Sequence, residues 1–230
     1  MSKLVSIIMP ALNEAIAIPG VIRNIPIDVF ADMGYDVEIL VVDNGSLDGT
    51  KEKALEAGAR VVFEPRTGYG YAYKKGFAEA KGSIICTLDA DGSYPTDVIP
   101  DYVNHLLDDD LDFISTDRLK FLKDGAMNGV NRVGNAVLSF VSRLLFRFPF
   151  RDSQSGMWVF RKSLLKKLKL CSGGMALSEE IKVRTACDLN AKVTEFPIHY
   201  ANRFGTPKLR PWRDGFINLF HLLRLRLIRR

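Results

Sequence analysis

Short apolar runs alternate with longer, more polar segments through the first half of the chain. The apolar runs have the length of buried strands and cover residues 4–9, 37–42, 60–63, 84–88 and 112–115. Segments bounded by turn residues predict helices at residues 15–24, 50–58, 69–80 and 96–107. Pro10 is expected to end the first strand, and Thr96 to cap the last of these helices. This alternation predicts an α/β fold with a mostly parallel central sheet flanked by helices.

The second half of the chain is less regular. Residues 135–150 carry many large apolar side chains around Arg143 and Arg147, and they predict an amphipathic helix. This helix either faces the core or provides a membrane-contact surface. Residues 193–200 predict a strand in which Pro197 lies at an edge or a bulge. Because no internal repeat or low-complexity linker interrupts the chain, we expect one main domain.

Length and composition are those of a globular protein. The chain has 230 residues, of which 47% are hydrophobic and 26% are charged. Its three cysteines lack the C-x-x-C spacing of a zinc site and fit a reducing compartment. The N-terminus lacks a signal-peptide pattern, and no apolar run reaches the roughly 20 residues of a membrane span. We therefore expect a peripheral protein on the cytoplasmic side of a membrane.

The formal net charge of +5 is concentrated at the C-terminal end. Residues 210–230 contain six arginines and one aspartate, so the rest of the chain is balanced in charge. Large apolar residues alternate with these arginines, whereas nucleic-acid-binding proteins more often spread cations over a folded face. We predict a domain at residues 1–209 and a basic amphipathic helix at 210–230 that contacts a membrane surface, with no nucleic acid as partner. A helix packed on its own domain is the alternative.

Acidic residues follow two of the predicted strands. Asp89 and Asp91 come after the strand at 84–88, and Asp43 follows the strand at 37–42. In open α/β sheets, ligands bind beyond the carboxyl ends of the strands. Two carboxylates one residue apart can hold Mg²⁺ or Mn²⁺ together with substrate phosphates. Asp43 either caps the turn that follows it or accepts hydrogen bonds from a nucleotide base.

Two common nucleotide-binding signatures are missing from the sequence. No Gly-x-Gly-x-x-Gly follows the first predicted strand, and no Gly-x-x-x-x-Gly-Lys-Ser/Thr loop is present. The three histidines are isolated in the sequence, and no Ser/His/Asp or Cys/His set can be recognised. These absences argue against a dinucleotide-binding Rossmann enzyme, a P-loop enzyme and a hydrolase of the triad type.

Five stretches together resemble a known family. They are residues 6–14 (SIIMPALNE), 41–50 (VVDNGSLDGT), 88–92 (LDADG), 152–156 (DSQSG) and 203–208 (RFGTPK). In this order they resemble the family 2 glycosyltransferases with a GT-A fold, in particular the dolichyl-phosphate mannose synthase-like branch, and they span nearly the whole chain. The resemblance implies an inverting, metal-dependent transfer of a sugar from a nucleotide-diphosphate donor to a polyprenyl phosphate.

The resemblance also implies roles for individual residues. The nucleotide-holding positions of the family match Pro10, Leu12, Glu14, Asp43, Asp89 and Ala90. Asp89 is expected beside the ribose and the sugar, and Asp91 matches the metal ligand that bridges to the diphosphate, so this pair forms the expected metal site.

Basic residues in the second half match the family's phosphate-binding positions. Arg118 and Arg132 match arginines that hold the acceptor phosphate, and Arg203 and Lys208 match a basic pair near the donor phosphates. An acidic residue that lines the site in relatives matches either Glu179 or Glu180, and the sequence does not distinguish between them.

Two positions depart from the family's pattern. Ser93 stands where mannose synthases often carry a larger amide near the metal, and Trp158 stands where relatives often carry an arginine. The expected donor is a UDP-hexose, a UDP-N-acetylhexosamine or GDP-mannose. Residues 68–70 and 156–158 look less like those of the mannose synthases, which favours the UDP-sugars. The alternatives are a related transferase acting on a soluble glycan or protein acceptor, and a non-catalytic basic module that binds membranes or nucleic acid.

Overall fold

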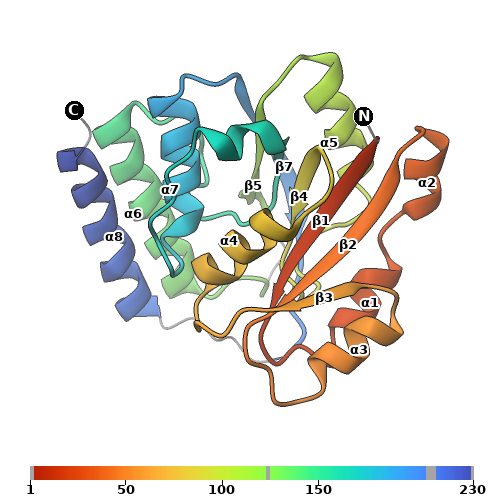
Figure 1. The fold of residues 1–230 in the computed structure, drawn as a ribbon. Coiled ribbons are helices and arrows are strands. Elements are labelled where there is room, and N and C mark those ends of the chain that lie inside the picture. The colour runs from red at the N-terminus through yellow and green to blue at the C-terminus, as the bar shows by residue number, and fades with distance from the viewer. Residues whose placement is uncertain (1–2, 123–124, 206–210, 229–230) are drawn as a thin grey trace.

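The computed structural model describes residues 3–122, 125–205 and 211–228. They form a seven-stranded sheet in the order β3-β2-β1-β4-β6-β5-β7, with helices on both faces (Figure 1). The strands are β1 (Leu4–Ala11), β2 (Asp36–Asp43), β3 (Arg60–Phe63), β4 (Ile84–Thr87), β5 (Phe113–Leu122), β6 (Trp158–Arg161) and β7 (Val193–Tyr200). The α-helices are α1 (Ile18–Arg23), α2 (Ile27–Asp32), α3 (Thr50–Glu56), α4 (Tyr69–Glu79), α5 (Ile99–Asp108), α6 (Gly129–Phe146), α7 (Leu177–Val183) and α8 (Pro211–Ile228).

The first four strands confirm the predicted parallel arrangement. β1 pairs in parallel with β2 on one side and with β4 on the other, and β2 pairs in parallel with β3. The expectation that Pro10 ends the first strand is wrong, because β1 continues to Ala11. Pairing with β4 stops at Ile8, so Pro10 lies beside β2 alone, where the loss of one backbone donor is tolerated.

The sheet changes direction at β6, a strand that the sequence did not predict. β6 is only four residues long and runs antiparallel to both of its neighbours, β4 and β5. Beyond it, β5 and β7 are parallel to each other, and the register between them shifts after the pair Asp117 and Pro197. The prediction of an edge strand with Pro197 at an irregularity is therefore confirmed.

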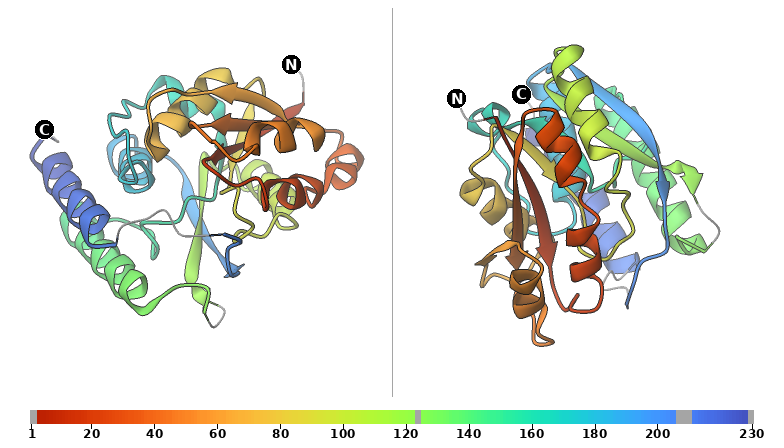
Figure 2. Two further views of the ribbon diagram at one scale, coloured as in Figure 1. Left: turned by 90° about the horizontal axis from the view of Figure 1, so that it is seen from below. Right: turned by 90° about the vertical axis from the view of Figure 1, so that its right-hand side faces the viewer.

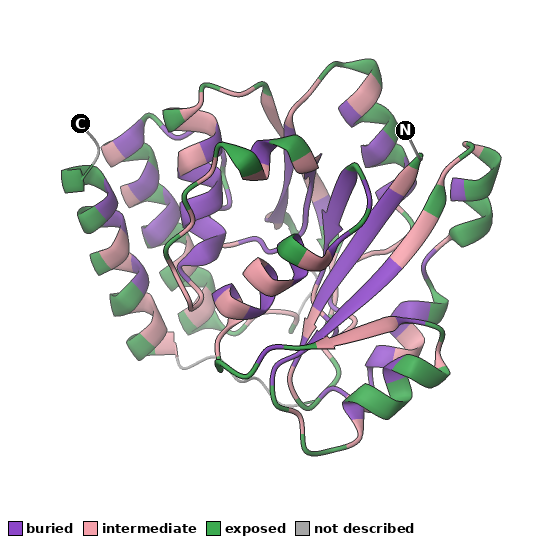
Figure 3. Ribbon diagram, viewed as in Figure 1, coloured by how far each residue is buried: buried purple, intermediate pink, exposed green. Residues whose placement is uncertain are grey.

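Alternate residues of β1 divide the core into two layers. Ile7 and Met9 pack with residues of α1, α2 and α5 on one face of the sheet, and Ile8 packs with residues of α4, α7 and α8 on the other. Figure 3 shows that the central strands are buried along most of their length. Burial on both faces explains why these strands appear in the sequence as continuous apolar runs.

Two helices begin at other residues than the sequence suggested. The helix expected at 96–107 begins at Ile99, and the Thr96 hydroxyl donates to the carbonyl of Asn24 at 2.8 Å instead of capping it. The helix expected at 135–150 begins at Gly129, because the Asn128 side chain accepts from Asn131 N at 2.8 Å and caps its first turn.

Helices α6, α7 and α8 pack against one another beside the sheet (Figures 1 and 2). Helix α8 buries Asn218, Leu222 and Leu225 in this layer. The helix predicted at 210–230 thus packs on the rest of the chain, while much of its surface stays exposed. The predicted boundary between residues 209 and 210 lies outside the described residues. Within the described part of the chain, no helix combines the length and hydropathy needed to cross a bilayer.

Candidate active site

The predicted site residues of the first half meet at one edge of the sheet. β1 and β2 end side by side, with Ala11 opposite Asp43, and the segment 88–92 follows β4 on the other side of β1. Three neighbouring parallel strands therefore deliver their connecting loops to the same place. The sequence predicted this convergence from the order of strands alone.

The loops after β1 and β2 are fixed to each other by short polar side chains. Asn13 accepts from Leu47 N at 2.8 Å through Oδ1, and its own backbone N donates to Ser46 Oγ at 2.9 Å. Glu14 N donates to Thr50 Oγ1 at 2.8 Å. These bonds hold the first loop, with its nucleotide-binding candidates, against the loop after β2, and Leu12 lies partly exposed between Pro10 and Glu14.

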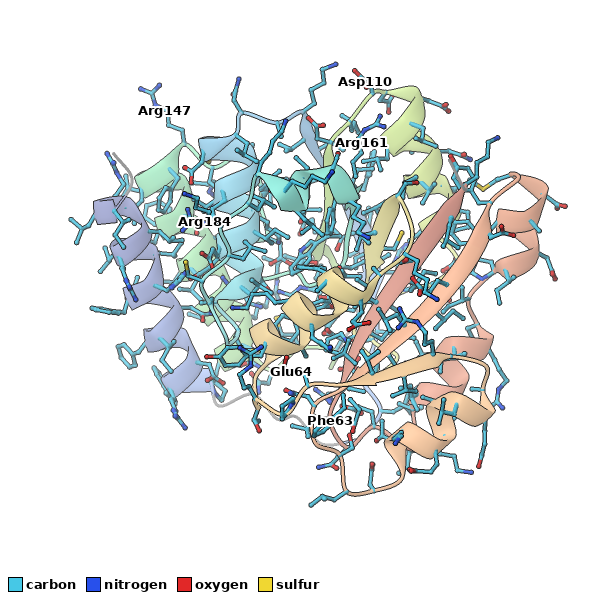
Figure 4. All side chains as sticks on the ribbon, in the orientation of Figure 1. Phe63, Glu64, Asp110, Arg147, Arg161 and Arg184 are labelled. Carbon is cyan, nitrogen blue, oxygen red and sulfur yellow. The ribbon has the colours of Figure 1, made fainter. Side chains whose placement is uncertain are left out.

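Asp43 and its neighbour Asn44 have different tasks. Asp43 is buried and accepts from Ser46 N at 3.1 Å, which is the turn-capping role considered from the sequence. Asn44 was not singled out. Its Nδ2 donates to the carbonyls of Glu64 and Arg66 at 2.8 and 2.9 Å, so it holds the loop that follows β3. Figure 4 shows Glu64 directly after Phe63 at the end of that strand.

Arg66 is a second residue that the sequence analysis missed. It pairs with Glu64, with Arg66 Nε 2.7 Å from Oε1, and its guanidinium lies 4.6 Å from the centre of the Tyr71 ring. The pairing holds the pKa of the Glu64 carboxyl well below its usual range, to about 2. The missed signal was positional, because Arg66 follows a strand that ends at the same sheet edge as Asp43.

Arg203, in the second half of the chain, forms ion pairs with two acidic residues of the first half, Glu14 and Asp91. Arg203 donates to Glu14 Oε1 at 3.0 Å and lies 3.3 Å from Asp91 Oδ2. Asp91 Oδ1 accepts from both the backbone N and the hydroxyl of Ser93, at 3.0 and 2.6 Å. The backbone N of Phe204 donates to the Asp91 carbonyl at 2.9 Å. The segment around Arg203 therefore lies across the acidic motif.

Asp89 has the electrostatic setting of a ligand-binding carboxylate. Its side chain is partly exposed, yet Oδ1 is enclosed and has no hydrogen-bond partner among the described residues. Burial of the carboxyl and the nearby charge of Asp91 raise the pKa of Asp89 to about 7, against the opposing influence of Arg118 and Arg203. A carboxylate oxygen left without a partner in an enclosed place is costly unless a ligand satisfies it.

Gly156 brings the loop 152–156 against Asp89. A Cβ at this position would lie 2.1 Å from the Tyr69 hydroxyl and 3.6 Å from Asp89 Oδ1, so only glycine fits. The backbone N of Gly156 donates to the Tyr94 hydroxyl at 2.8 Å, and its carbonyl accepts from Thr87 at 2.8 Å. Trp158, two residues further on, is fully buried behind this loop and belongs to the core.

Arg118 is engaged inside the protein. Its guanidinium donates to both carboxylate oxygens of Asp152, at 2.7 and 3.0 Å, in a buried bidentate pair. Burial alone would raise the pKa of Asp152, but the charge of Arg118 and its hydrogen bonds keep it below the ordinary value. Lys182 donates to the Asp152 carbonyl at 2.7 Å. The Arg118 guanidinium is thus held in place by Asp152.

The remaining predicted basic residues lie at different places. Arg132 is exposed on the first turn of α6. Gly125, just before this helix, lies against Asn202, where a Cβ would be 3.6 Å from the Asn202 Oδ1, so the start of α6 is close to the segment that carries Arg203. Lys208 lies outside the described residues.

The structure distinguishes between the two glutamates of α7. Glu180 accepts from the backbone N of Cys171 and Ser172 and from Arg184 Nε at 3.0 Å, so its carboxylate is used to hold a loop. Glu179 is fully buried, accepts from Gln154 Nε2 at 2.9 Å, and has no partner for Oε1 among the described residues. Since Gln154 belongs to the loop that touches Asp89, Glu179 is the one connected to the site.

Comparison with known proteins agrees with this geometry. The family model described as Glycosyl transferase family 2 matches residues 6–169. Glycosyltransferase AglJ of Haloferax volcanii is 32% identical over 223 residues, which cover 96% of this chain and 71% of that protein. A dolichyl-phosphate hexose transferase of the same organism is 32% identical over 212 residues, covering 91% of this chain and 88% of that protein. The chain belongs to glycosyltransferase family 2.

Solved structures show the same fold. Glucosyl-3-phosphoglycerate synthase from Mycobacterium tuberculosis, in complex with Mg²⁺ and uridine diphosphate, matches with a TM-score of 0.75 at 23% identity, covering 97% of this chain and 79% of that chain. The GT-A fold expected from the sequence is confirmed. The protein is thus a glycosyltransferase that uses a nucleotide-sugar donor.

Proposed function

We propose that this enzyme transfers a hexose or N-acetylhexosamine from a nucleotide-diphosphate donor to a polyprenyl phosphate, with inversion at the anomeric carbon. The observation that carries the proposal is the group formed by Asp89, Asp91 and Arg203 at the ends of the parallel strands. It combines carboxylates suited to a metal and a sugar with a cation suited to a diphosphate. A relative named dolichyl-phosphate hexose transferase supports the choice of acceptor.

The residues present fit a divalent metal. Asp89 Oδ1 lacks a partner among the described residues, and the charges of Asp89 and Asp91 repel each other, which a divalent cation would relieve. The described residues contain no group of three or more metal-ligating side chains. Mg²⁺ commonly binds through one or two carboxylates together with substrate phosphates and water, so Asp89 and Asp91 suffice. Bound there, Mg²⁺ or Mn²⁺ would supply charge stabilisation for the departing diphosphate.

The nucleotide is expected on the loops that are already fixed. Pro10, Leu12, Glu14 and Asp43 border the edge of the sheet where β1 and β2 end, with Ala90 between the two acidic residues after β4. Rigid loops of this kind lose little entropy on binding. UDP-sugars are the preferred donors in our proposal, supported by the fold shared with a synthase that binds uridine diphosphate.

A phosphate acceptor needs little activation. A polyprenyl phosphate is anionic at neutral pH, so one of its oxygens can attack the anomeric carbon while the bond from that carbon to the donor diphosphate breaks and the nucleoside diphosphate leaves with the electron pair. The protein must bring two anions together and stabilise the leaving charge. We assign the acceptor phosphate to Arg118 and Arg132, and the donor phosphates to Arg203 and Lys208.

Two exposed apolar faces support a peripheral position at a membrane surface. Helix α6 exposes Val133, Val137, Phe140 and Leu144, and α8 exposes Trp212, Phe216, Phe220 and Leu227. The two helices pack side by side at the outer end of the molecule (Figure 2). Arginines accompany these side chains on both helices, which favours anionic lipid surfaces. Such a surface would present the lipid acceptor to Arg132 at the start of α6.

The central experiment crosses donors with acceptors. Purified protein is incubated with UDP-glucose, UDP-N-acetylglucosamine or GDP-mannose, and with dolichyl phosphate, undecaprenyl phosphate or 3-phosphoglycerate, with and without Mn²⁺. We expect a lipid-linked product that depends on the metal. Transfer only to the soluble phosphate would favour the alternative of a soluble acceptor and overturn the proposal.

The membrane face is tested by vesicle co-sedimentation. Phe220→Ser should weaken binding to vesicles that contain anionic lipid by about tenfold, because one aromatic side chain loses its apolar surroundings. Rising salt should weaken the remaining binding. The matched control is Ile27→Ser, which changes an exposed apolar residue on α2 and should leave binding unchanged. Equal binding by Phe220→Ser and the wild type would remove α8 from the membrane-contact surface.

A further inference from the structure

Helix α8 is connected to the active-site loop by a chain of hydrogen bonds through two side-chain amides, of which Asn218 is buried and Gln154 is partly exposed. Asn218 is buried on the inner side of α8, and its Nδ2 donates to Gln154 Oε1 at 2.8 Å. Gln154 Nε2 in turn donates to Glu179 Oε2 at 2.9 Å and to Ser153 Oγ at 2.9 Å. The chain thus joins α8, the loop 152–156 and α7, which are far apart in sequence.

The loop in the middle of this chain borders the reacting groups. Its first residue, Asp152, holds Arg118 through both carboxylate oxygens, and its last, Gly156, lies against Asp89 and Tyr69. The side chain of Gln154 reaches α7 and α8, whereas Ser153 and Ser155 bond to Ser139 and Thr116. A shift of Gln154 therefore moves a loop that touches both Arg118 and Asp89.

Asn218 on α8 sets the orientation of the Gln154 side-chain amide. Because Asn218 donates to Gln154 Oε1, the Gln154 amide must turn its Nε2 toward Glu179. Burial raises the pKa of the Glu179 carboxyl, which favours its protonated form. Without the Asn218 donor, the Gln154 amide could therefore turn over and accept a hydrogen bond from that carboxyl. A buried oxygen without a partner among the described residues lies at each end of this chain of hydrogen bonds. These oxygens are Asn218 Oδ1 and Glu179 Oε1. Buried polar groups of this kind are retained at a cost in stability.

We propose that Asn218 and Gln154 are positioning residues of the active site, through which α8 supports turnover independently of its contact with lipid. The proposal rests on the transferase function proposed above. A helix α8 that supports turnover differs in one measurable respect from a helix that only anchors the protein to a membrane. If α8 only anchored the protein, a change on its buried side would leave the reaction with a water-soluble acceptor unaffected.

The test uses the full chain and a short-chain, water-soluble polyprenyl phosphate without vesicles. Asn218→Leu should lower kcat about tenfold, the range expected when a partly buried hydrogen bond is lost and its partner is left unsatisfied, while KM for the nucleotide sugar stays unchanged. Its vesicle binding should equal that of the wild type, because the side chain is buried away from the exposed face. Asn104→Leu, the same change at an exposed site on α5, is the matched control and should keep the full rate.

A double-mutant cycle separates this role from general loosening of the helix. In the combined variant Asn218→Leu and Gln154→Leu, kcat should fall no further than with Gln154→Leu alone, because both changes break the same chain. If the two effects multiply, or if Asn218→Leu keeps the full rate on the soluble acceptor, the proposal is wrong. Should Asn218→Leu fail to fold, Asn218→Ala removes the same donor with a smaller side chain and should give the same loss.

A readout without substrate keeps the proposal separate from the transferase function. In the wild type, the Gln154 side-chain amide protons should exchange slowly with solvent in NMR spectra, and Asn218→Ala should speed their exchange at least about tenfold. Unchanged exchange would overturn the chain of amides even if sugar transfer is observed. Failure of the wild type to transfer sugar to any polyprenyl phosphate, with the exchange difference intact, would instead overturn the proposed acceptor.

Discussion

The two halves of the sheet build their part of the site in different ways. In the half formed by β1 to β4, candidate residues stand next to strand ends, and the loops are fixed by short polar side chains such as Asn13 and Asn44. In the half formed by β5 to α8, candidate groups are held by buried contacts between distant segments, as in the pair of Arg118 and Asp152. The first half thus offers a rigid surface for a ligand, and the second depends on the packing of several helices.

This difference predicts which property a mutation in each half should change. A change at a strand-end loop of the first half should affect ligand binding and turnover more than folding, because few other contacts depend on it. A change in the second half should affect stability and turnover together, because the same buried groups support both. The following predictions test that division in order of decreasing effect.

The largest expected effect is on turnover in the first half. Asp91→Ala should lower sugar transfer by about a thousandfold, because the proposed metal loses a carboxylate ligand and Arg203 loses a partner. The melting temperature should change by only a few degrees, because relief of the repulsion between Asp91 and Asp89 offsets the lost hydrogen bonds from Ser93. Radiolabelled sugar transfer and thermal unfolding are measured on the same samples. Asp101→Ala on α5 is the control, and full activity of Asp91→Ala would exclude the metal assignment.

The next effect is on stability in the second half. Asp152→Asn should lower the free energy of unfolding by about 3–5 kcal/mol, because Arg118 is left as a buried charge without its carboxylate. Urea denaturation measures this, and activity should fall with it. The comparison variant is Glu56→Gln, which breaks the exposed pair with Lys53 and should cost at most about 1 kcal/mol. Similar losses for both variants would contradict the division between the halves.

A smaller effect is expected where the halves meet. Gly156→Ala should lower kcat by roughly tenfold to a hundredfold, because the new methyl group would overlap the Tyr69 hydroxyl and push the loop away from Asp89. Adding Tyr69→Phe removes that hydroxyl and should restore part of the rate. Steady-state kinetics of the single and double variants measure this. If the second change gives no recovery, the loop is not held by this close approach.

The smallest effect concerns the pH dependence of stability. The pKa of Asp89 is about 7 in the folded protein and about 4 when unfolded, so the folded state binds the proton more tightly. The stabilisation from the protonated carboxyl is complete below about pH 4, falls as pH rises, and is lost above about pH 7. Asp89→Asn, which cannot ionise, should therefore gain about 1–2 kcal/mol over the wild type at pH 8, a value reduced for its partial exposure.

Thermal unfolding without metal checks this difference between pH 5 and pH 8. The melting temperature of Asp89→Asn should exceed that of the wild type by a few degrees at pH 8 and match it more closely at pH 5. Asp101→Asn, an exposed change on α5, should run parallel to the wild type. A constant offset for Asp89→Asn across this range would show that its carboxyl is not perturbed.

The pattern of the sequence is enough to predict the parallel strands of the first half and the sheet edge where its candidate site residues meet. Apolar runs such as 37–42 and 84–88 are buried on both faces, so their composition alone marks them, and the acidic residues that follow them must meet at one edge of a parallel sheet. Only the tertiary structure revealed β6, because a four-residue strand held by neighbours distant in sequence carries no pattern of its own.

Tertiary structure also decided between Glu179 and Glu180, and it revealed the link from Asn218 to Gln154. Glu179 and Glu180 are the same residue type at adjacent positions of one helix, so no sequence signal distinguishes them. What distinguishes them is which way each side chain points and which distant donor it meets. Local sequence marks the strands that are buried on both faces, whereas the partners of buried polar groups are settled only when separate segments pack together.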